Sequence, residues 1–205
     1  MIERYSRVEM SSKWDLQAKY KAWLKVELAA VKAWNELGLI KKDDCEKILK
    51  NAKFDIGRID EIEKTTKHDV IAFLTSVSEN LGAESRFLHY GMTSSDCIDT
   101  AVALQVRDSL DLIITDTQNL LKALEKRAFE FKDTLMVGRS HGIHGEPITF
   151  GLVLAVWFDE IKHALSLLEN AKECISYGKL SGAMGNFAHA PLEFEEKVCK
   201  NLGLK

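Results

Sequence analysis

Apolar residues recur at helical spacing near the start of the chain. Between Asp15 and Leu37, steps of four and three separate the apolar positions, which are Tyr20, Leu24, Leu28, Val31 and Trp34. This spacing places them on one face of a helix, and Gly38 supplies the left-handed residue that commonly ends one. Three shorter helices are predicted next, each with an aspartate positioned to cap its first amides: Asp43, Asp55 and Asp69. The pattern predicts a small helical domain over residues 1–91.

A second pattern begins at Met92, because neither glycine nor proline occurs from there to Val137. One apolar stripe follows this stretch without a break and consists of Ile98, Val102, Val106, Leu110, Ile113, Thr117, Leu120, Leu124, Ala128 and Phe131. A helix of about 37 residues fits, with a length of about 55 Å. Further apolar residues lie outside the stripe, which is typical of a helix with several neighbours inside a bundle.

The remaining chain predicts one more long helix, over about residues 148–177, and one short helix that opens at Pro191, since proline suits the first helical turn. A glycine-rich segment, residues 178–185, separates the two. We therefore predict an all-α fold: a small amino-terminal helical domain over residues 1–91, then the first long helices of a central bundle over residues 92–205. These helices do not close a bundle, so we expect the chain to assemble with copies of itself or to be the front part of a longer protein.

Composition and charge exclude several classes of function. The 205 residues carry a net charge of −3, without the basic stripe that neutralises nucleic acid phosphates. The longest strongly apolar run, residues 152–158, is far shorter than the ~20 residues that cross a bilayer, and the first residues lack the apolar core of a signal peptide. We expect a cytoplasmic protein with no nucleic acid or membrane partner. The cysteines lack a C-x-x-C pair, and we expect them to be reduced and mostly buried in packing: Cys45, Cys97, Cys174 and Cys199.

Three of the six histidines lie in short polar connections next to predicted helix starts, where exposed amides permit anion binding and catalysis. They are His68, His89 and His141. Asp69 is placed both to cap a helix and to hold His68, and His141 lies in the segment 138–147, where three glycines and a proline indicate an unusual backbone path. For each histidine alone, the alternative is a surface residue satisfied by caps and water.

Metal chemistry is not favoured by the sequence. His141 and His144 have H-x-x-H spacing, but no acidic or thiol ligand lies at a supporting distance. His163 falls inside a predicted helix and is interpreted as structural. We expect neither a metal nor another cofactor.

The long helix begins with Thr93-Ser94-Ser95-Asp96. Hydroxyls and free amides meet there at the positive end of the helix dipole, an arrangement that binds carboxylate or phosphate. The alternative is simple capping of the helix by Ser94 or Ser95. A serine nucleophile and a phosphate-binding loop are not indicated, because neither G-x-S-x-G nor G-x-x-x-x-G-K-[ST] is present.

Four segments stand in order along the chain: MIERYS at 1–6, TKHDV at 66–70, HYGMTSSD at 89–96, and GRSH with EP between 138 and 147. In these segments the chain resembles the front half of the adenylosuccinate lyases, a family of the fumarase and aspartase superfamily. The resemblance implies β-elimination of fumarate from adenylosuccinate, which yields AMP, and from the succinyl-carboxamide ribotide of an earlier purine step.

The resemblance also implies roles for individual residues. His141 is the expected general acid and His68 its support, although the residues leave open which of the two delivers the proton. Thr93 and Ser94 would hold the succinyl carboxylate at the helix start. The remaining expected substrate contacts are Arg4 and Tyr5 at the nucleotide, together with Lys67, Asp69 and Ser140, and His89 is a further candidate.

Chains of this family are more than twice as long, assemble as tetramers and combine segments of three subunits in each active site. Their base comes from a serine loop that lies outside these residues. We therefore expect a nucleotide substrate, a homo-oligomer, and a truncated chain that is inactive or nearly so alone.

Two alternatives stay open. Another fumarate-releasing lyase, such as an argininosuccinate lyase or a fumarase, would share the reaction type without the nucleotide. A non-catalytic helical oligomerisation module would explain the long helices but not the glycine-rich loop around His141.

Overall fold

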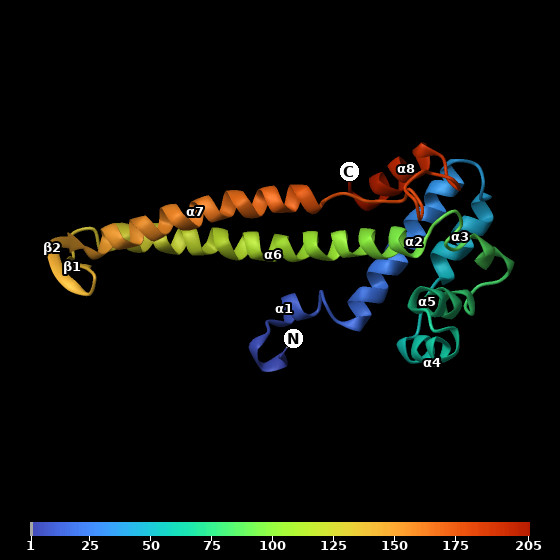
Figure 1. Ribbon diagram of the computed structural model, residues 1–205, viewed down its shortest axis with the longest axis horizontal. Coiled ribbons are helices and arrows are strands. Elements are labelled where there is room, and N and C mark those ends of the chain that lie inside the picture. Colours follow the sequence, from blue (N-terminus) through green and yellow to red (C-terminus); the bar gives the residue numbers. More distant parts are fainter. Residues whose placement is uncertain (1) are drawn as a thin grey trace. The chain divides into compact units, whose positions relative to one another are not determined.

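The computed structural model of the protein describes residues 2–205, and Met1, the first residue of the motif MIERYS, lies outside the described residues. The chain is mostly helical, as predicted (Figure 1). The helices are α1 (Val8–Ser11), α2 (Leu16–Glu36), α3 (Lys42–Asn51), α4 (Ile56–Thr66), α5 (Asp69–Ser78), α6 (Ser94–Glu130), α7 (Phe150–Ile175) and α8 (Leu192–Leu202), with short 3-10 turns η1 (Glu3–Tyr5) and η2 (Ala83–Phe87).

The described residues form two compact units. The first comprises the residues up to Asp108 together with Ile175–Lys205, and the second is Ser109–Cys174. The last residues rejoin the first unit because the chain doubles back on itself: Lys205 N–H donates to Ser176 O at 2.9 Å, and Gly178 N–H donates to Lys205 O at 3.0 Å. The expected domain boundary between residues 91 and 92 is a separate division and stays a prediction.

Helix α2 follows the sequence prediction closely. The Asp15 carboxylate accepts a hydrogen bond from Ala18 N–H at 2.6 Å, which caps the first turn, and Gly38 adopts φ 80° after the last turn. The buried face is wider than predicted. Leu24 and Leu28 are only half-buried, whereas Trp23 and Val26 are fully buried.

Aromatic rings dominate the core of the first unit. Trp23 and Phe73 meet edge to face with ring centroids 5.5 Å apart, and Tyr20 stacks on Phe73 at 5.7 Å. Trp34 of α2 stacks on Phe194 of α8 at 4.3 Å. Such pairs add to the free energy gained by burying the rings, so α2 is fixed against α5 at Trp23 and against α8 at Trp34.

One of the three predicted aspartate caps is wrong. Asp55 caps α4 as predicted, since its side chain accepts from Arg58 N–H at 2.7 Å. Asp69 is the first residue of α5, behind the N-cap His68, and its Oδ1 accepts from the first-turn amide of Val70 at 2.8 Å. Asp43 instead lies in the first turn of α3 behind Lys41. Acidic residues inside the first turn still favour the helix through its dipole, which explains why the helices begin nearby.

Helix α6 has 37 residues, the predicted length. In the first unit its buried face is formed by Cys97, Ala101 and Leu104, whereas Val102 of the predicted stripe is 40% exposed. The predicted face is therefore wrong there.

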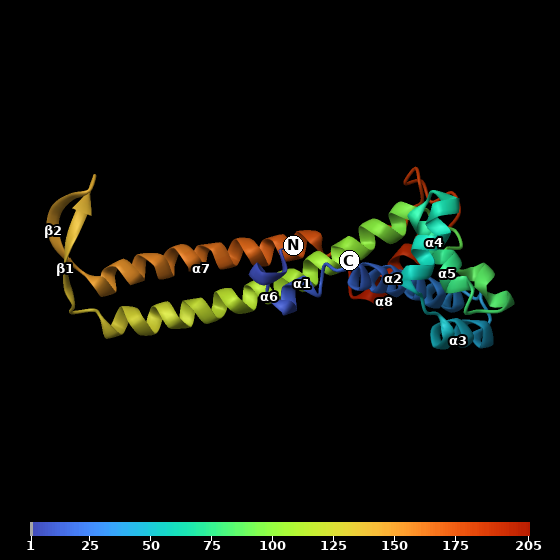
Figure 2. The same ribbon diagram turned by 90° about the horizontal axis from the view of Figure 1, so that it is seen from below.

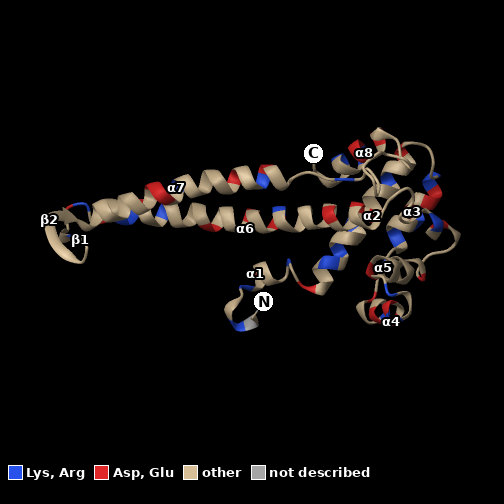
Figure 3. Cartoon of the chain, viewed as in Figure 1, with Lys and Arg blue, Asp and Glu red and all other residues tan. Residues whose placement is uncertain are grey.

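Lysines and arginines are interspersed with acidic residues along α2 and α4 (Figure 3). In the described part of the chain, no helix combines the length and apolar character of a membrane span.

The second unit is a helical hairpin that ends in a β-hairpin. The part of α6 beyond Ser109 and α7 run side by side in opposite directions (Figures 1 and 2), and Lys172 Nζ pairs with Asp111 Oδ1 at 2.5 Å. Between them, β1 (Leu135–Ser140) and β2 (Ile143–Thr149) pair antiparallel. The segment 138–147 is therefore not an irregular loop but most of a strand pair.

Cys174, expected among packing residues, is exposed, whereas Cys45, Cys97 and Cys199 are buried.

Candidate active site

His68 occupies the connection between α4 and α5. Lys67 ends α4 in the left-handed conformation with φ 53°, and His68 then caps α5, with its Nδ1 accepting from Ile71 N–H at 3.4 Å. Because Nδ1 acts as an acceptor here, a neutral His68 ring carries its proton on Nε2. The side chain is 42% exposed. His68 therefore presents Nε2 as the atom that can donate a proton or a hydrogen bond to a ligand.

Asp69 lies beside this histidine. Its Oδ1 is 3.7 Å from His68 Nδ1 and accepts from Val70 N–H at 2.8 Å, while Oδ2 lies 4.0 Å from Lys19 Nζ. His68 and Asp69, two expected site residues of the motif TKHDV, thus lie side by side at the start of α5. Lys67 is exposed, so its ammonium group is accessible to an anionic ligand.

The start of α6 is organised by Asp96. Its Oδ2 accepts from Thr93 N–H at 2.9 Å, and Asp96 N–H donates back to Thr93 O at 2.9 Å. The Asp96 carboxylate thus makes the half of a capping box that reaches back to the N-cap amide, while the Thr93 carbonyl, and not its side chain, accepts from Asp96 N–H. Capping by Ser94 or Ser95, the alternative, is not what the structure shows, because Ser94 is the first helical residue and Ser95 Oγ accepts from Lys179 Nζ at 3.3 Å. Thr93 and Ser94 are half-buried at this helix start.

Lys179 is a contact at the α6 start that the sequence did not indicate. Its Nζ lies 2.6 Å from Asp96 Oδ1, and it also donates to Gly182 O at 2.6 Å. Asp96 is completely buried, so this ion pair compensates a carboxylate that water does not reach. The pair ties the glycine-rich segment, residues 178–185, to the α6 start. Its signal in the sequence was only a lysine among glycines, which indicates no partner.

His89 is held by a second buried carboxylate. Glu27 of α2 is 1% exposed, and its Oε2 accepts from His89 N–H at 2.8 Å while Oε1 lies 2.7 Å from His89 Nδ1. Burial by itself lowers the pKa of His89, but the hydrogen bond and charge of Glu27 and the charge of Asp96 outweigh it and raise the pKa above its usual value. Glu27 lies 62 residues away in sequence, so no local pattern indicated this partner.

Residues of α2 contact both the α5 start and the α6 start. Lys19, beside Asp69, places its ammonium 4.5 Å from the Trp23 ring centroid, and Trp23 O is 3.7 Å from Cys97 Sγ near the α6 start. Burial, followed by the charges of Glu27, Asp96 and Asp69, raises the pKa of the Cys97 thiol well above its usual range. Cys97 therefore lies within the field of acidic side chains on α2, α5 and α6.

Arg4 and Tyr5 belong to the short turn η1. The Arg4 guanidinium carbon lies 4.8 Å from the Tyr5 ring centroid, a cation–π distance, and Tyr5 is 74% exposed. Both side chains are accessible to a ligand.

His141 lies at the tip of the β-hairpin in the second unit. His141 and Gly142 form the two-residue turn between paired Ser140 and Ile143, with φ 52° and 74°. Positive φ at both positions defines a type I′ turn, which positions His141 by backbone geometry rather than by side-chain packing. His141 and Ser140 are exposed, so the walls of any site around them come from residues outside the hairpin.

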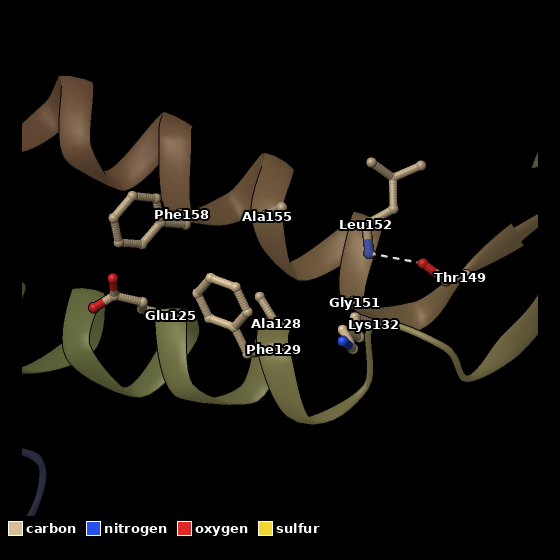
Figure 4. Close-up of a pocket in the computed structure, with 9 residues that line it drawn as sticks. All are labelled: Glu125, Ala128, Phe129, Lys132, Thr149, Gly151, Leu152, Ala155 and Phe158. Carbon is tan, nitrogen blue, oxygen red and sulfur yellow. Dashed lines mark hydrogen bonds between the residues drawn. The ribbon is translucent and has the colours of Figure 1, made fainter.

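A hollow of about 530 Å³ lies between the end of α6 and the start of α7 (Figure 4). Phe129 and Phe158 approach it from opposite helices, and Thr149 Oγ1 accepts from Leu152 N–H at 3.2 Å. The other lining residues are Glu125, Ala128, Lys132, Gly151 and Ala155. None of the predicted site residues lines it.

In the described part of the chain no group of histidine, cysteine or acidic side chains is arranged to hold a metal ion.

A family model described as lyase matches residues 4–205. The chain therefore belongs to this lyase family.

Among individual proteins, the chain is similar to adenylosuccinate lyases. An adenylosuccinate lyase of Helicobacter pylori is 62% identical over 205 residues, which is all of this chain and 47% of that protein. The Bacillus subtilis adenylosuccinate lyase is 48% identical over the same length, again all of this chain and 48% of the relative. The chain thus spans about half the length of the curated relatives it matches.

Solved structures share the fold. A fumarate lyase from Mesorhizobium sp. BNC1 aligns with a TM-score of 0.90 and 28% identity, covering 95% of this chain and 48% of that one. A 3-carboxy-cis,cis-muconate lactonizing enzyme from Pseudomonas putida aligns with a TM-score of 0.88 at 24% identity, covering 98% of this chain and 48% of that one. The latter similarity supports the fold alone.

Proposed function

We propose that the protein to which this chain belongs is an adenylosuccinate lyase that releases fumarate from adenylosuccinate to give AMP, and from the succinyl-carboxamide ribotide. The observation that carries this proposal is the 62% identity to the Helicobacter pylori enzyme across all of this chain, including every segment that bears a candidate residue. A homotetramer acting in the cytoplasm is part of the proposal.

The chemistry requires a base, an acid and a group that binds the carboxylate beside the reacting carbon. A base removes a proton from the carbon beside a succinyl carboxylate, the C–H electron pair forms the double bond of fumarate, and the C–N bond breaks while an acid protonates the departing nitrogen. His141 is proposed as that acid, since an imidazole exchanges a proton near neutral pH. His68 supports it by hydrogen bonding to the substrate through Nε2.

The α6 start is proposed to bind the carboxylate that gains charge during the reaction. Thr93 and Ser94 lie where helix amides favour negative charge. Asp96 also accepts a hydrogen bond there, but Lys179 compensates its charge at 2.6 Å, which limits repulsion of the substrate. Arg4, Tyr5, Lys67, Asp69 and Ser140 are proposed as contacts to the rest of the nucleotide.

The test is fumarate release from adenylosuccinate by the complete protein that carries these residues. His141→Asn is the informative variant, because asparagine followed by Gly142 is the favoured pair of a type I′ turn and keeps the hairpin while removing the imidazole. We expect kcat to fall by about 10²–10⁴-fold. His144→Asn, an exposed neighbour on β2, should change kcat less than about twofold. Equal activity of both variants would exclude His141 as the acid.

A ligand comparison separates this proposal from a related lyase. A ligand that binds only the folded state raises the unfolding temperature. AMP should do so in the complete protein, whereas argininosuccinate should not, and the reverse result would favour an argininosuccinate lyase. The 205-residue chain alone is expected to release no fumarate, because the proposed base lies outside it.

A further inference from the structure

Glu27 is a buried carboxylate that the proposed chemistry does not use. It lies in the middle of α2 with 1% exposure, and both its oxygens contact His89, one at the backbone N–H and one at Nδ1. Burying a carboxylate is costly unless each oxygen is hydrogen-bonded and the charge is compensated. His89 meets the first demand through its backbone N–H and Nδ1, and it meets the second when its ring is protonated.

His89 is constrained just as strongly. Its backbone has φ 57°, a conformation that a non-glycine residue adopts at a cost, and its ring is 19% exposed. The Glu27 hydrogen bonds to the backbone and to Nδ1 fix the main chain and the ring together. The Glu27 contact therefore determines which ring nitrogen stays available.

That nitrogen is Nε2. Among the described residues, no buried side-chain nitrogen or oxygen lacks a hydrogen-bond partner, and Glu27 is bonded to Nδ1 only. Nε2 is therefore on the accessible edge of the ring. His89 O accepts from Met92 N–H at 3.2 Å, which places the residue one turn before Thr93 and the α6 start.

The charged groups around His89 favour its cationic form. Glu27 faces it from α2, and Asp96 acts on it from α6 with Lys179 as the ion-pair partner. An imidazolium next to a helix start adds a full positive charge to the partial charges of the amides. Such a group binds carboxylate or phosphate oxygen.

We propose that Glu27 is a positioning residue: through its paired hydrogen bonds to the backbone N–H and to Nδ1 it orients the His89 ring, with Nε2 directed toward an anionic group of the substrate beside the α6 start. This inference rests on the proposed function for its substrate, but not for its anion chemistry. Glu27 touches no substrate itself and acts only through His89.

Glu27→Gln tests this role, because glutamine keeps the shape and removes the charge: its oxygen can accept from His89 N–H, while its NH2 can only donate to the Nδ1 of a neutral ring. In the 205-residue chain, ¹⁵N NMR of the His89 ring should show its pKa at least one unit lower in Glu27→Gln than in the parent chain. Inorganic phosphate, the probe, should shift the His89 signals in the parent chain and bind at least tenfold more weakly to the variant. Glu36→Gln is the matched control on the same helix, since Glu36 is exposed and pairs with Lys197 at 3.2 Å.

The complete protein supplies the second readout. Glu27→Gln should raise KM at least tenfold at neutral pH with a smaller change in kcat, and the rise in KM with pH should begin at lower pH than in the parent. If Glu27→Gln does not fold, His89→Gln replaces it, since the amide retains a partner for Glu27 while the charge is lost, and the same loss of phosphate binding is expected.

The results separate the two proposals. Unchanged His89 titration, or phosphate binding equal in Glu27→Gln and Glu36→Gln, overturns the role of Glu27 even if the protein is an adenylosuccinate lyase. Absence of fumarate release with intact, Glu27-dependent phosphate binding overturns the proposed function and leaves the positioning role supported.

Discussion

Lys179 Nζ lies 2.6 Å from Asp96 Oδ1, although the two residues are 83 positions apart in the sequence. Asp96 is completely buried, and its other oxygen holds Thr93 N–H. One carboxylate thus joins the α6 start, where the substrate carboxylate is proposed to bind, to the glycine-rich segment 178–185.

Removing Lys179 should destabilise the chain. Lys179→Met leaves the buried Asp96 charge without its cation, and we expect the free energy of unfolding to fall by about 2 kcal/mol, less than for a fully buried pair because Lys179 is 38% exposed. Urea unfolding measures this. Lys197→Met, which breaks only an exposed pair with Glu36, should cost less than about 1 kcal/mol. Equal losses in both variants would contradict the importance of the buried pair.

Gly138 should be required for the hairpin that carries His141. A Cβ atom there would lie 2.7 Å from Glu146 O, at the irregularity in pairing between Val137 and Arg139. Gly138→Ala is expected to reduce hydrogen-exchange protection of the β1 and β2 amides and to lower kcat of the complete protein. At Gly145, across the hairpin, the nearest atom would be 3.7 Å away, so Gly145→Ala should leave both unchanged. Loss of protection in Gly145→Ala alone would refute this.

Gly151 should tolerate replacement by alanine as poorly as Gly138, because a side chain there would meet α6. A Cβ atom at this residue would lie 2.5 Å from Ala128 O and 2.6 Å from Lys132 Cα, so Gly151→Ala should force the start of α7 away from the end of α6. We expect a loss of about 2 kcal/mol or more in the free energy of unfolding. Gly57→Ala, in the exposed helix α4, should instead stabilise the chain by about 0.5–1 kcal/mol. Thermal unfolding distinguishes the two signs.

Stability should depend on pH through His89. Its pKa is raised in the folded chain, so protonation stabilises the fold, fully below the ordinary histidine pKa of about 6.5 and less as the pH rises through the raised folded value. The unfolding free energy relative to a His89→Gln variant should therefore decrease above neutral pH. Urea midpoints measured across this range test the sign. If this difference in unfolding free energy grows with pH instead, burial and not Glu27 dominates the pKa of His89.

Local sequence patterns predicted the helices well. The length of α6, the Asp55 cap and the Gly38 stop all depend on residues close together in the chain. The hairpin at 135–149 was predicted only as a constrained loop, because histidine followed by glycine is a weaker turn signal than asparagine followed by glycine. The resemblance to a lyase family was confirmed, while the roles of individual site residues stay predictions.

The sequence by itself determined which segments become helices and that His68 lies at a helix start, because capping and helical periodicity act over a few residues. His141, expected next to a helix start, lies instead at the tip of the β-hairpin. Only the tertiary structure decided how Asp96 and Glu27 are compensated. Lys179 and His89 reach these carboxylates from 83 and 62 residues away. Burial makes each pairing necessary, since a charge removed from water needs a partner, but it acts through space and leaves no periodic trace in the sequence.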